Sequence, residues 1–439
     1  MDYRECAEVV GELQRARADG RYLPELLTAL GEPARGLRGM QVVGTNGKGS
    51  TCAFAVAALT GMGLRVGSLP SPHLQEPRER IRVGGVPVSE AEYVAVLEEV
   101  LAAMRATGRT FNASSLHAAA AALHFRRADV RFVAAEANIG GRTTAVGSFG
   151  LDVKVVTGVG LDHTDRLGAT EAEIARVKVG VARDGDHVLL GRLSAQAREA
   201  ADEVLAGHTG LTVWRLGHEI RVEARTAADG GTLLEVRTPQ GVHRDLVCTL
   251  PGAHQYDNLA LAVAGVDALV ARGHVAADRG GRLRAGLART RWPGRLELVP
   301  GARVRGWSGR VLLDGATNEQ GVATVAPEIA RHVRASDRVP AAVVFGVMRG
   351  KPAARMLAAL PSGWPVVLTR TSSSDAADPD VLAALPREHG DDRPTCVEPD
   401  VRTALGRAGE LVGPGGLVVV LGSHKLVGEA RTALGLPPA

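Results

Sequence analysis

The segment Gly44–Thr51 has the residue types of a phosphate-binding loop, and it carries one of only five lysines in a chain of 439 residues. Its sequence is Gly-Thr-Asn-Gly-Lys-Gly-Ser-Thr; the strand-like segment Gln41-Val42-Val43 precedes it and an alanine-rich stretch at 51–62 follows. This pattern predicts a strand, a loop and a helix, whose backbone N–H groups and lysine ammonium would bind phosphate oxygens. The usual consensus has four residues between its first glycine and Gly-Lys, whereas two stand here, so an ordinary glycine-rich turn is the alternative.

Two further residues with cation-binding side chains come at the ends of predicted strands. Glu136 ends the apolar run 132–135, and His163 follows the run 153–160. Because an open parallel sheet binds its ligands at the carboxyl ends of its strands, we expect both residues near the phosphate loop. They would complete the site of the divalent cation that accompanies phosphate. Taken singly, the first is equally a capping carboxylate and the second a histidine bonded to a backbone carbonyl.

Lys178 is the second informative lysine, because the chain otherwise uses arginine for nearly all of its 52 basic residues. It lies among apolar neighbours in a helix predicted to begin at Thr170. An amine can react with carbon dioxide, which a guanidinium cannot, and the resulting carbamate anion is able to bind a second magnesium ion. A lysine on a solvated helix face is the alternative.

The composition is that of a globular protein with two or three domains. Aromatic residues are only 3% of the chain and its net charge is +4, which leaves little for a nucleic-acid-binding surface. The four cysteines lie far apart, which favours reduced thiols in a cytoplasmic protein. The first residues are polar, and no apolar run is long enough to span a membrane.

Short apolar runs alternate with helical patterns from the loop onward, which predicts an α/β fold with a mainly parallel sheet of the phosphate-loop type. Two-residue alternation between 218 and 250 predicts a small antiparallel part, with a turn at 229–231. A helix is predicted over 254–271, and the sequences that begin at Ser89 and Thr170 are those of capping boxes that open helices. The alternation restarts after residue 295, with strands predicted near 311–314, 341–346, 365–370 and 417–421, which indicates a smaller, Rossmann-like α/β domain. We place the boundary so that residues 1–297 form the first domain and 298–439 the second.

Several motifs, in this order along the chain, together resemble the folylpolyglutamate synthase and dihydrofolate synthase family of the Mur ligase superfamily. They are Gly44–Thr51; Ser71-Pro72-His73-Leu74 with Glu79-Arg80-Ile81; Gly160-Leu161-Asp162-His163; Lys178; His254-Gln255 with Asn258; Pro293-Gly294-Arg295; Asp314-Gly315-Ala316; and Gly422-Ser423. The resemblance covers nearly the whole chain.

The resemblance implies a monomeric, ATP-dependent ligase that converts a carboxylate to an acyl phosphate and joins it to an amine, with ADP and phosphate as by-products. It implies that the first domain binds ATP and that the C-terminal domain serves the amine substrate. Implied magnesium ligands are Ser71, Glu136, His163 and Lys178 as its carbamate. Implied ATP contacts are Gly44, Thr45, Asn46, Gly47, Lys48, Gly49, Ser50, Thr51, Asn258, Arg295 and Asp314. Lys48, Lys178 and His163 are the predicted catalytic residues.

The departures from the family lie on the substrate side. The family motif Glu-x-Gly-x-Gly-Gly-Arg-x-Asp reads Glu136-Ala137-Asn138-Ile139-Gly140-Gly141-Arg142-Thr143-Thr144 here. Thr317 replaces a histidine, Phe111-Asn112 replaces Phe-Glu, Gly350-Lys351 replaces Asp-Lys, and Ser372–Ser374 stand where an arginine is common.

Our main hypothesis from these departures is a ligase of specialised metabolism, whose acid, amine or both differ from folate and glutamate. A genuine folate enzyme that adds L-glutamate to dihydropteroate or folate is one alternative. A nucleotide-dependent ATPase or switch without ligase activity is the other. In each case we expect small-molecule substrates and neither a nucleic-acid nor a membrane partner.

Overall fold

The computed structural model describes residues 1–15, 22–141, 144–227, 231–278, 280–334, 340–388 and 393–439. The chain forms two compact units. Unit 1 contains Met1–His73, Pro77–Thr249 and Ala253–Arg291, and unit 2 contains Leu74–Glu76, Leu250–Gly252 and Trp292–Ala439. The long continuous part of unit 2 therefore begins at Trp292. The roles assigned to the two domains remain predictions. No helix in the described ranges is long and apolar enough to cross a membrane.

The described part of unit 1 contains an eight-stranded sheet that carries the predicted phosphate loop near its centre. Its order is β4-β3-β2-β5-β1-β6-β7-β8, and all neighbouring pairs are parallel except β2 with β3 and β3 with β4. The strands are β1 (Arg38–Val43), β2 (Val66–Leu69), β3 (Arg82–Val83), β4 (Val86–Pro87), β5 (Phe132–Glu136), β6 (Val153–Val156), β7 (His187–Leu190) and β8 (Thr212–Arg215). The prediction of an α/β fold with a mainly parallel sheet is confirmed.

Helices cover both faces of this sheet because its strands are apolar on both sides. Val43 and Val133 share one core with Leu97 and Phe125 from helices α4 and α5. Met40 faces the other way and lies against α9. The helices of unit 1 are α1 (Tyr3–Arg15), α2 (Leu23–Ala29), α3 (Lys48–Gly61), α4 (Glu90–Thr107), α5 (Ala113–Arg127), α6 (Thr164–Leu167), α7 (Glu171–Val179), α8 (Ala195–Ala206), α9 (His254–Ala271) and α10 (Arg282–Leu287).

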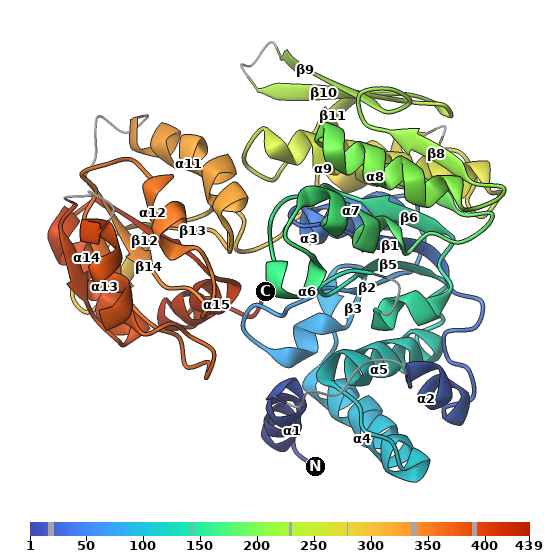
Figure 1. Cartoon of the computed structure of the whole chain (residues 1–439), viewed down its shortest axis with the longest axis horizontal. Helices are drawn as coiled ribbons and strands as arrows, with labels where there is room; N and C mark the ends of the chain where they lie inside the picture. Colours follow the sequence, from blue (N-terminus) through green and yellow to red (C-terminus); the bar gives the residue numbers. More distant parts are fainter. Residues whose placement is uncertain (16–21, 142–143, 228–230, 279, 335–339, 389–392) are drawn as a thin grey trace. The chain divides into compact units, whose positions relative to one another are not determined.

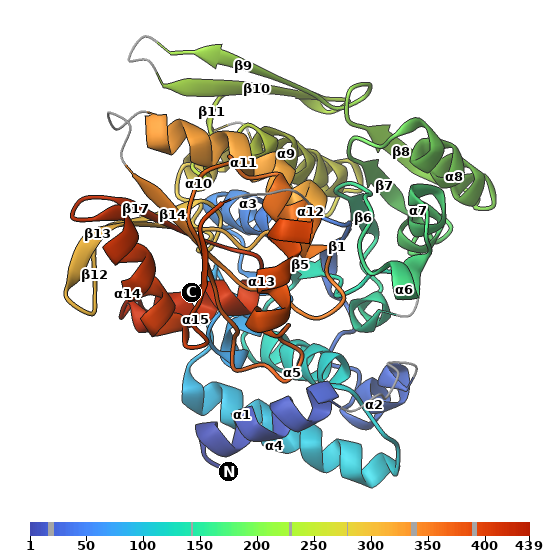
Figure 2. The same cartoon turned by 60° about the vertical axis from the view of Figure 1, so that its left-hand side comes forward.

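The antiparallel part of unit 1 is a three-stranded sheet of β9 (Arg221–Thr226), β10 (Thr232–Thr238) and β11 (Gly241–Val247). It lies at the end of unit 1 away from α1, α4 and α5, as both views show (Figures 1 and 2). His243 and Thr238 bond to Asp267, which fastens this sheet to α9. Most of the predicted turn at 229–231 falls outside the described residues.

Unit 2 is a smaller α/β body around a six-stranded sheet of described residues, with order β12-β13-β17-β14-β15-β16. All pairs are parallel except β12 with β13. Its strands are β12 (Glu297–Val304), β13 (Trp307–Leu313), β14 (Ala341–Phe345), β15 (Val366–Leu368), β16 (Thr395–Val397) and β17 (Leu417–Leu421). Its helices are α11 (Glu319–Arg334), α12 (Ala353–Ala358), α13 (Pro379–Glu388), α14 (Val401–Val412) and α15 (His424–Ala433).

Candidate functional site

The loop between β1 and α3 has the backbone shape that its glycines predict. Gly44 and Gly47 have φ angles of 149° and 86°, which strain any residue with a Cβ. A Cβ on Gly44 would lie 2.0 Å from Thr157 Oγ1, and one on Gly47 would lie 2.3 Å from Asn258 Oδ1. Glycine at these two positions therefore lets β6's end and α9 approach the loop closely.

Helix α3 begins at Lys48, three residues earlier than the sequence predicts. Lys48, Gly49, Ser50 and Thr51 therefore form its first turn. The N–H groups of Lys48, Gly49 and Ser50 have no intrahelical acceptors, whereas the Thr51 N–H bonds the Gly47 carbonyl at 2.9 Å. Asn46, just before the turn, accepts a hydrogen bond at its carbonyl from Thr157 Oγ1 at 2.6 Å. This arrangement points a helix N-terminus at the space an anion would occupy.

The Lys48 ammonium lies beside the predicted metal ligand Glu136. Its Nζ is 3.9 Å from Glu136 Oε1 and donates to the Thr45 carbonyl at 3.0 Å. The two side chains are only 15% and 7% exposed, so little water screens their attraction. The structure thus brings together a loop lysine and a strand-end carboxylate that are 88 residues apart in the sequence.

Ser71, the predicted hydroxyl ligand, joins the same cluster. Its backbone N–H donates to Glu136 Oε2 at 3.2 Å, and its Oγ donates to Asn138 Oδ1 at 3.2 Å. The same Oγ accepts a hydrogen bond from Arg80 Nη2. Ser71 and Glu136 therefore place a hydroxyl and a carboxylate side by side at the carboxyl ends of β2 and β5.

The segment that carries His163 is tied to the phosphate loop through Thr45. The Thr45 hydroxyl accepts from the Gly160 N–H at 3.0 Å and donates to the Gly160 carbonyl at 3.1 Å. His163 has a φ of 50° and precedes α6, with its N–H bonded to Asp162 Oδ1. The bonds of Thr45 therefore hold the 160–163 segment next to the phosphate loop.

The oxygen donors Ser71 Oγ and the Glu136 carboxylate fit a hard cation better than a soft one. In the described ranges, no three His, Cys, Asp or Glu side chains gather closely enough to hold a metal ion by themselves. Magnesium usually takes one or two carboxylates and completes its shell with phosphate oxygens and water. The residues present therefore suit a magnesium ion that arrives with a bound phosphate group.

Lys178 is buried, at 3% exposure, so the alternative of a solvated helix face is wrong. Its Nζ donates to the carbonyls of Gly44 and Ile139, at 2.9 and 3.3 Å. Burial, together with the nearby Lys48 ammonium, lowers the pKa of Lys178 to about 7, and Asp162 opposes this shift. Lys178 therefore links α7 to both the phosphate loop and the 137–141 loop.

Asn258 lies at the start of α9 and touches the phosphate loop, as its predicted role requires. Its Nδ2 donates to Gln255 Oε1 at 2.9 Å, and its Oδ1 lies 3.5 Å from Thr51 Oγ1. The preceding residue, Asp257, pairs with Arg192 Nε at 2.8 Å. The first turn of α9 is thereby fixed on two sides.

The two predicted ATP contacts of unit 2 lie on neighbouring segments. Asp314 is 3% exposed, and its carboxylate accepts hydrogen bonds from the N–H groups of Leu296 and Ala316, both at 2.9 Å. Arg295 directs its guanidinium at the His424 ring, with nitrogen distances of 3.3 and 3.5 Å. Asp314 thus holds in place the loop that carries Arg295.

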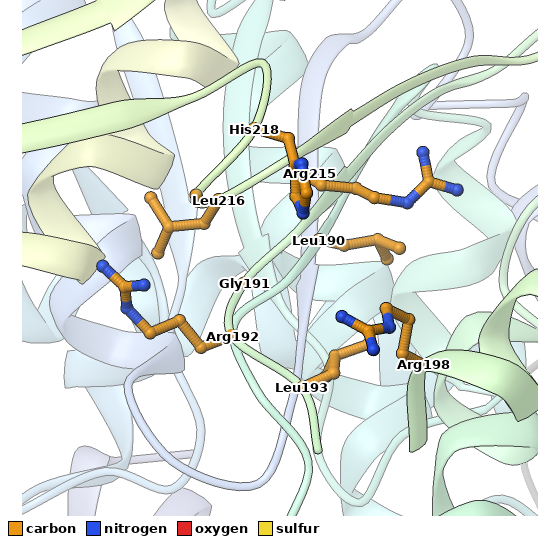
Figure 3. A pocket seen from close by; sticks show the side chains of 9 residues that line it. Leu190, Gly191, Arg192, Leu193, Arg198, Arg215, Leu216 and His218 are labelled. Atoms are coloured by element: carbon orange, nitrogen blue, oxygen red, sulfur yellow. The ribbon is translucent and has the colours of Figure 1, made fainter. Parts of the chain in front are cut away.

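A separate cavity of about 310 Å³ lies where β7 and β8 end (Figure 3). Arg192 stands on one side of it in this view, with Arg198 and Arg215 on the other. Arg192 pairs with Asp257, and Arg215 pairs with Asp202 at 2.8 Å, so the cavity has little excess positive charge. The residues that line it include none of the predicted site residues: Leu190, Gly191, Arg192, Leu193, Arg198, Arg215, Leu216, Gly217 and His218.

Sequence reasoning missed the contribution of Asn138, of His117 and of His424 to these clusters. His117 of α5 lies 3.5 Å from Arg80 Nη1 and 3.0 Å from Tyr93 Oη of α4. No local sequence pattern shows that these three residues lie together. His424 directly follows the Gly422-Ser423 motif, and this adjacency is the sequence signal that could have identified it. The motif Glu79-Arg80-Ile81 likewise marked Arg80 without showing what it contacts.

Comparisons with known proteins agree with this arrangement. Residues 294–424 match the family described as "Mur ligase, glutamate ligase domain". The chain is 32% identical to the dihydrofolate synthase/folylpolyglutamate synthase of Mycobacterium tuberculosis over 444 residues, which cover 94% of this chain and 89% of that protein. The Bacillus subtilis protein of the same name is 31% identical over 340 residues, or 76% of each chain.

A solved structure with the same fold comes from Mycobacterium tuberculosis as well. It is the folylpolyglutamate synthase complexed with ADP and AMPPCP, which aligns with a TM-score of 0.87 at 29% identity. The alignment covers 100% of both chains. Both units of the present chain therefore have counterparts in that structure.

Proposed function

Because the chain belongs to the dihydrofolate synthase/folylpolyglutamate synthase family of the Mur ligases, as its motifs predict, we propose that it adds L-glutamate to dihydropteroate or a folate. Membership makes it an ATP-dependent ligase that forms C–N bonds. The observation that carries the folate assignment is the match to curated folate ligases along 94% of the chain. The hypothesis of an altered acid or amine has no support from these relatives.

Two of the substrate-side substitutions have local structural explanations, which weakens the argument for an altered substrate. Asn112 is the N-cap of α5, where its Oδ1 accepts from the Ser115 N–H at 2.9 Å. Thr144 accepts a hydrogen bond from Gln41 Nε2 at 3.2 Å. Nothing in the structure explains Thr317. Residues that serve as a helix cap and as a partly buried hydrogen-bond partner can differ without any change of substrate.

The residues of unit 1 support a division of labour in the proposed reaction. Loop amides and Lys48 bind the β- and γ-phosphates of ATP, and Lys48 exchanges the Thr45 carbonyl for a phosphate oxygen. Ser71 and Glu136 hold magnesium, with His163 as a further ligand. The ion would supply charge neutralisation at the transferred phosphate. Because a carboxylate is a poor electrophile, phosphorylating it provides the leaving group that glutamate's amine displaces.

Arg295, Asp314 and Asn258 are proposed ATP contacts, with different roles. Asn258 can offer its amide directly, since it already borders the phosphate loop. Arg295 can offer its guanidinium, which His424 orients. Both Asp314 carboxylate oxygens accept backbone N–H groups, so we expect Asp314 to position its loop in addition to any nucleotide contact.

Lys178 is proposed to carry a carbamate that binds a second magnesium ion. Its amine is buried between the phosphate loop and the 137–141 loop, where an added anion would lie close to the ATP phosphates. A carbamate retains one N–H, so it can satisfy only one of the two carbonyls that the amine now bonds. The test is Lys178→Ala with and without added acetate. Unchanged turnover in the mutant would exclude the role, and recovery with acetate would support it.

The experiment that tests the folate assignment measures ADP release and product mass with magnesium, ATP and L-glutamate. Dihydropteroate and tetrahydrofolate are the two acids, and Lys48→Ala is the inactive control. We expect a glutamylated product with one ADP per bond. An amide formed only from another acid–amine pair would restore the altered-substrate hypothesis. ADP without any amide would favour an ATPase.

A further inference from the structure

The Ser71 hydroxyl is held from two sides by hydrogen bonds. It accepts from Arg80 Nη2 and donates to Asn138 Oδ1 at 3.2 Å. A hydroxyl has one proton and two lone pairs, so this arrangement leaves one lone pair unused by these two partners. The orientation of that lone pair depends on both neighbours keeping their places.

Asn138 is itself oriented by a second bond. Its Nδ2 donates to Ser114 Oγ at 3.0 Å, near the first turn of α5. In this orientation the amide nitrogen faces Ser114 and the amide oxygen faces Ser71. The Asn138 side chain is exposed, so packing alone does not impose this geometry.

Arg80 is fixed on the opposite side by buried groups. It is 5% exposed, its Nε donates to the Pro70 carbonyl at 3.5 Å, and its Nη1 lies 3.5 Å from His117 Nδ1. His117 is held by the Ala113 carbonyl at 2.7 Å and Tyr93 Oη at 3.0 Å. The amino end of α5 thus lies beside both neighbours of Ser71, with His117 next to Arg80 and Ser114 bonded to Asn138.

Asn138 also departs from the family motif. The motif Glu-x-Gly-x-Gly-Gly-Arg has glycine at this position, and glycine has no side chain to contact Ser71. Arg80, by contrast, belongs to the shared Glu-Arg-Ile motif. A chain with glycine at this position could not form the side-chain hydrogen bond that Asn138 accepts from Ser71.

We propose that Asn138 is a positioning residue for the divalent cation: it accepts the Ser71 proton and so keeps a lone pair of Ser71 Oγ available to the ion. A hydroxyl whose oxygen binds a cation becomes a stronger donor, which makes a fixed acceptor for its proton more valuable. The inference rests on the proposed function, because the ion is the one that accompanies ATP.

The test measures Mn²⁺ affinity by electron paramagnetic resonance for the full chain saturated with ADP, without an acid substrate. Asn138→Ala should bind Mn²⁺ roughly five-fold more weakly, as expected for the loss of one hydrogen bond. Its thermal midpoint should stay near that of the unmodified protein. Thr28→Ala is the matched control, since it also removes one exposed side-chain hydrogen bond, to Glu32, at a residue that is not part of the Ser71 cluster, and its Mn²⁺ affinity should not change.

Two further variants separate positioning from a general structural effect. In a Ser71→Ala background, Asn138→Ala should cause no additional loss of Mn²⁺ affinity, because its only proposed target is gone. Asn138→Asp keeps an acceptor oxygen and should bind Mn²⁺ at least as tightly as the unmodified protein. Equal affinity of Asn138→Ala and the unmodified protein, or an undiminished loss in the Ser71→Ala background, would overturn the proposal.

The outcome is distinguishable from failure of the proposed function. Mn²⁺ binding with ADP involves no folate. The assay therefore decides the role of Asn138 even if the protein ligates an acid other than folate. If folates are glutamylated and Asn138→Ala binds Mn²⁺ normally, only the role of Asn138 is wrong. If the unmodified protein binds no Mn²⁺ with ADP, the role of Asn138 is wrong, whereas the folate assignment is still decided by its own assay of product mass.

Discussion

Gly47→Ala is the substitution whose cost the structure defines best, because backbone and contact contributions can be separated. At a φ of 86° an L-residue costs about 1–2 kcal/mol. The new Cβ would also lie 2.3 Å from Asn258 Oδ1, so the Asn258 amide must move by roughly 1 Å. Such a shift breaks its bond to Gln255, worth about 1 kcal/mol.

The total loss of unfolding free energy for Gly47→Ala is therefore about 2–3 kcal/mol. Urea denaturation of the full chain measures it, and calorimetry with ADP measures the effect on the site. We expect ADP affinity to fall about ten-fold or more, because the loop and Asn258 are displaced together.

Gly63→Ala is the matched control for the backbone contribution. Gly63 has a φ of 89°, and a Cβ there would meet nothing within 4 Å in the described part of the chain. It should lose only about 1–2 kcal/mol and bind ADP normally. In an Asn258→Ala background, Gly47→Ala should cost no more than Gly63→Ala. Equal stability losses and unchanged ADP affinity in both glycine variants would refute the reasoning.

Three other predictions follow from single contacts. Burial lowers the pKa of His243, but the hydrogen bond and the charge of Asp267 raise it above its usual value. The pair therefore stabilises the fold below about pH 6.5, and this contribution is lost as pH rises through the raised pKa. Asp267→Asn should flatten the pH dependence of the unfolding free energy in urea over that range, and an unchanged slope would contradict this. Asn112→Ala removes the α5 cap and should cost about 1 kcal/mol in the same assay, with Asn112→Ser costing less. His424→Ala frees the Arg295 guanidinium and should weaken ATP binding several-fold with little change in unfolding midpoint, whereas equal ATP affinity would show that His424 does not orient Arg295.

Elements with strong local signals are the ones that sequence reasoning located well. Helix α9 and strand β17 begin and end at the predicted residues, and the capping boxes at Ser89 and Thr170 are both present. Strand β6 ends at Val156, four residues before the end of the predicted run at 160, and the hydroxyl of the next residue, Thr157, bonds the Asn46 carbonyl of the phosphate loop. Local chemistry predicts caps and buried strands, but the contact with a distant loop that follows the end of this strand is not visible in the sequence.

Strands β12 and β16 were missed for different physical reasons. β12 contains Pro300-Gly301, and its pairing with β13 shifts register between Val299 and Ala302. Such an irregularity hides the two-residue alternation that marks a strand. β16 has only three residues, all half-buried, at the edge of its sheet. It has too little apolar patterning to be recognised without its neighbour β15.

The candidate site was predictable where glycines and strand ends carry the information. The loop, Ser71, Glu136 and Lys178 lie together through contacts that parallel-strand geometry makes expected. The support from Tyr93, His117 and Asn138 was not predictable, because it depends on how α4 and α5 pack. Motifs point to the candidate site residues, but the residues that contact and orient those side chains are found only in three dimensions.

The division of the chain into units restricts how this enzyme can be recombined with its relatives. Unit 2 includes Leu74–Glu76 and Leu250–Gly252, so the polypeptide crosses between units at five points. Gln75 bonds Arg431 at 2.8 Å, and a Cβ on Gly428 would lie 1.8 Å from the Leu74 carbonyl. A chimera joined only at Trp292 would thus pair the C-terminal body with foreign versions of two of its own segments. Successful domain exchange should require transplanting both short segments together with residues 292–439.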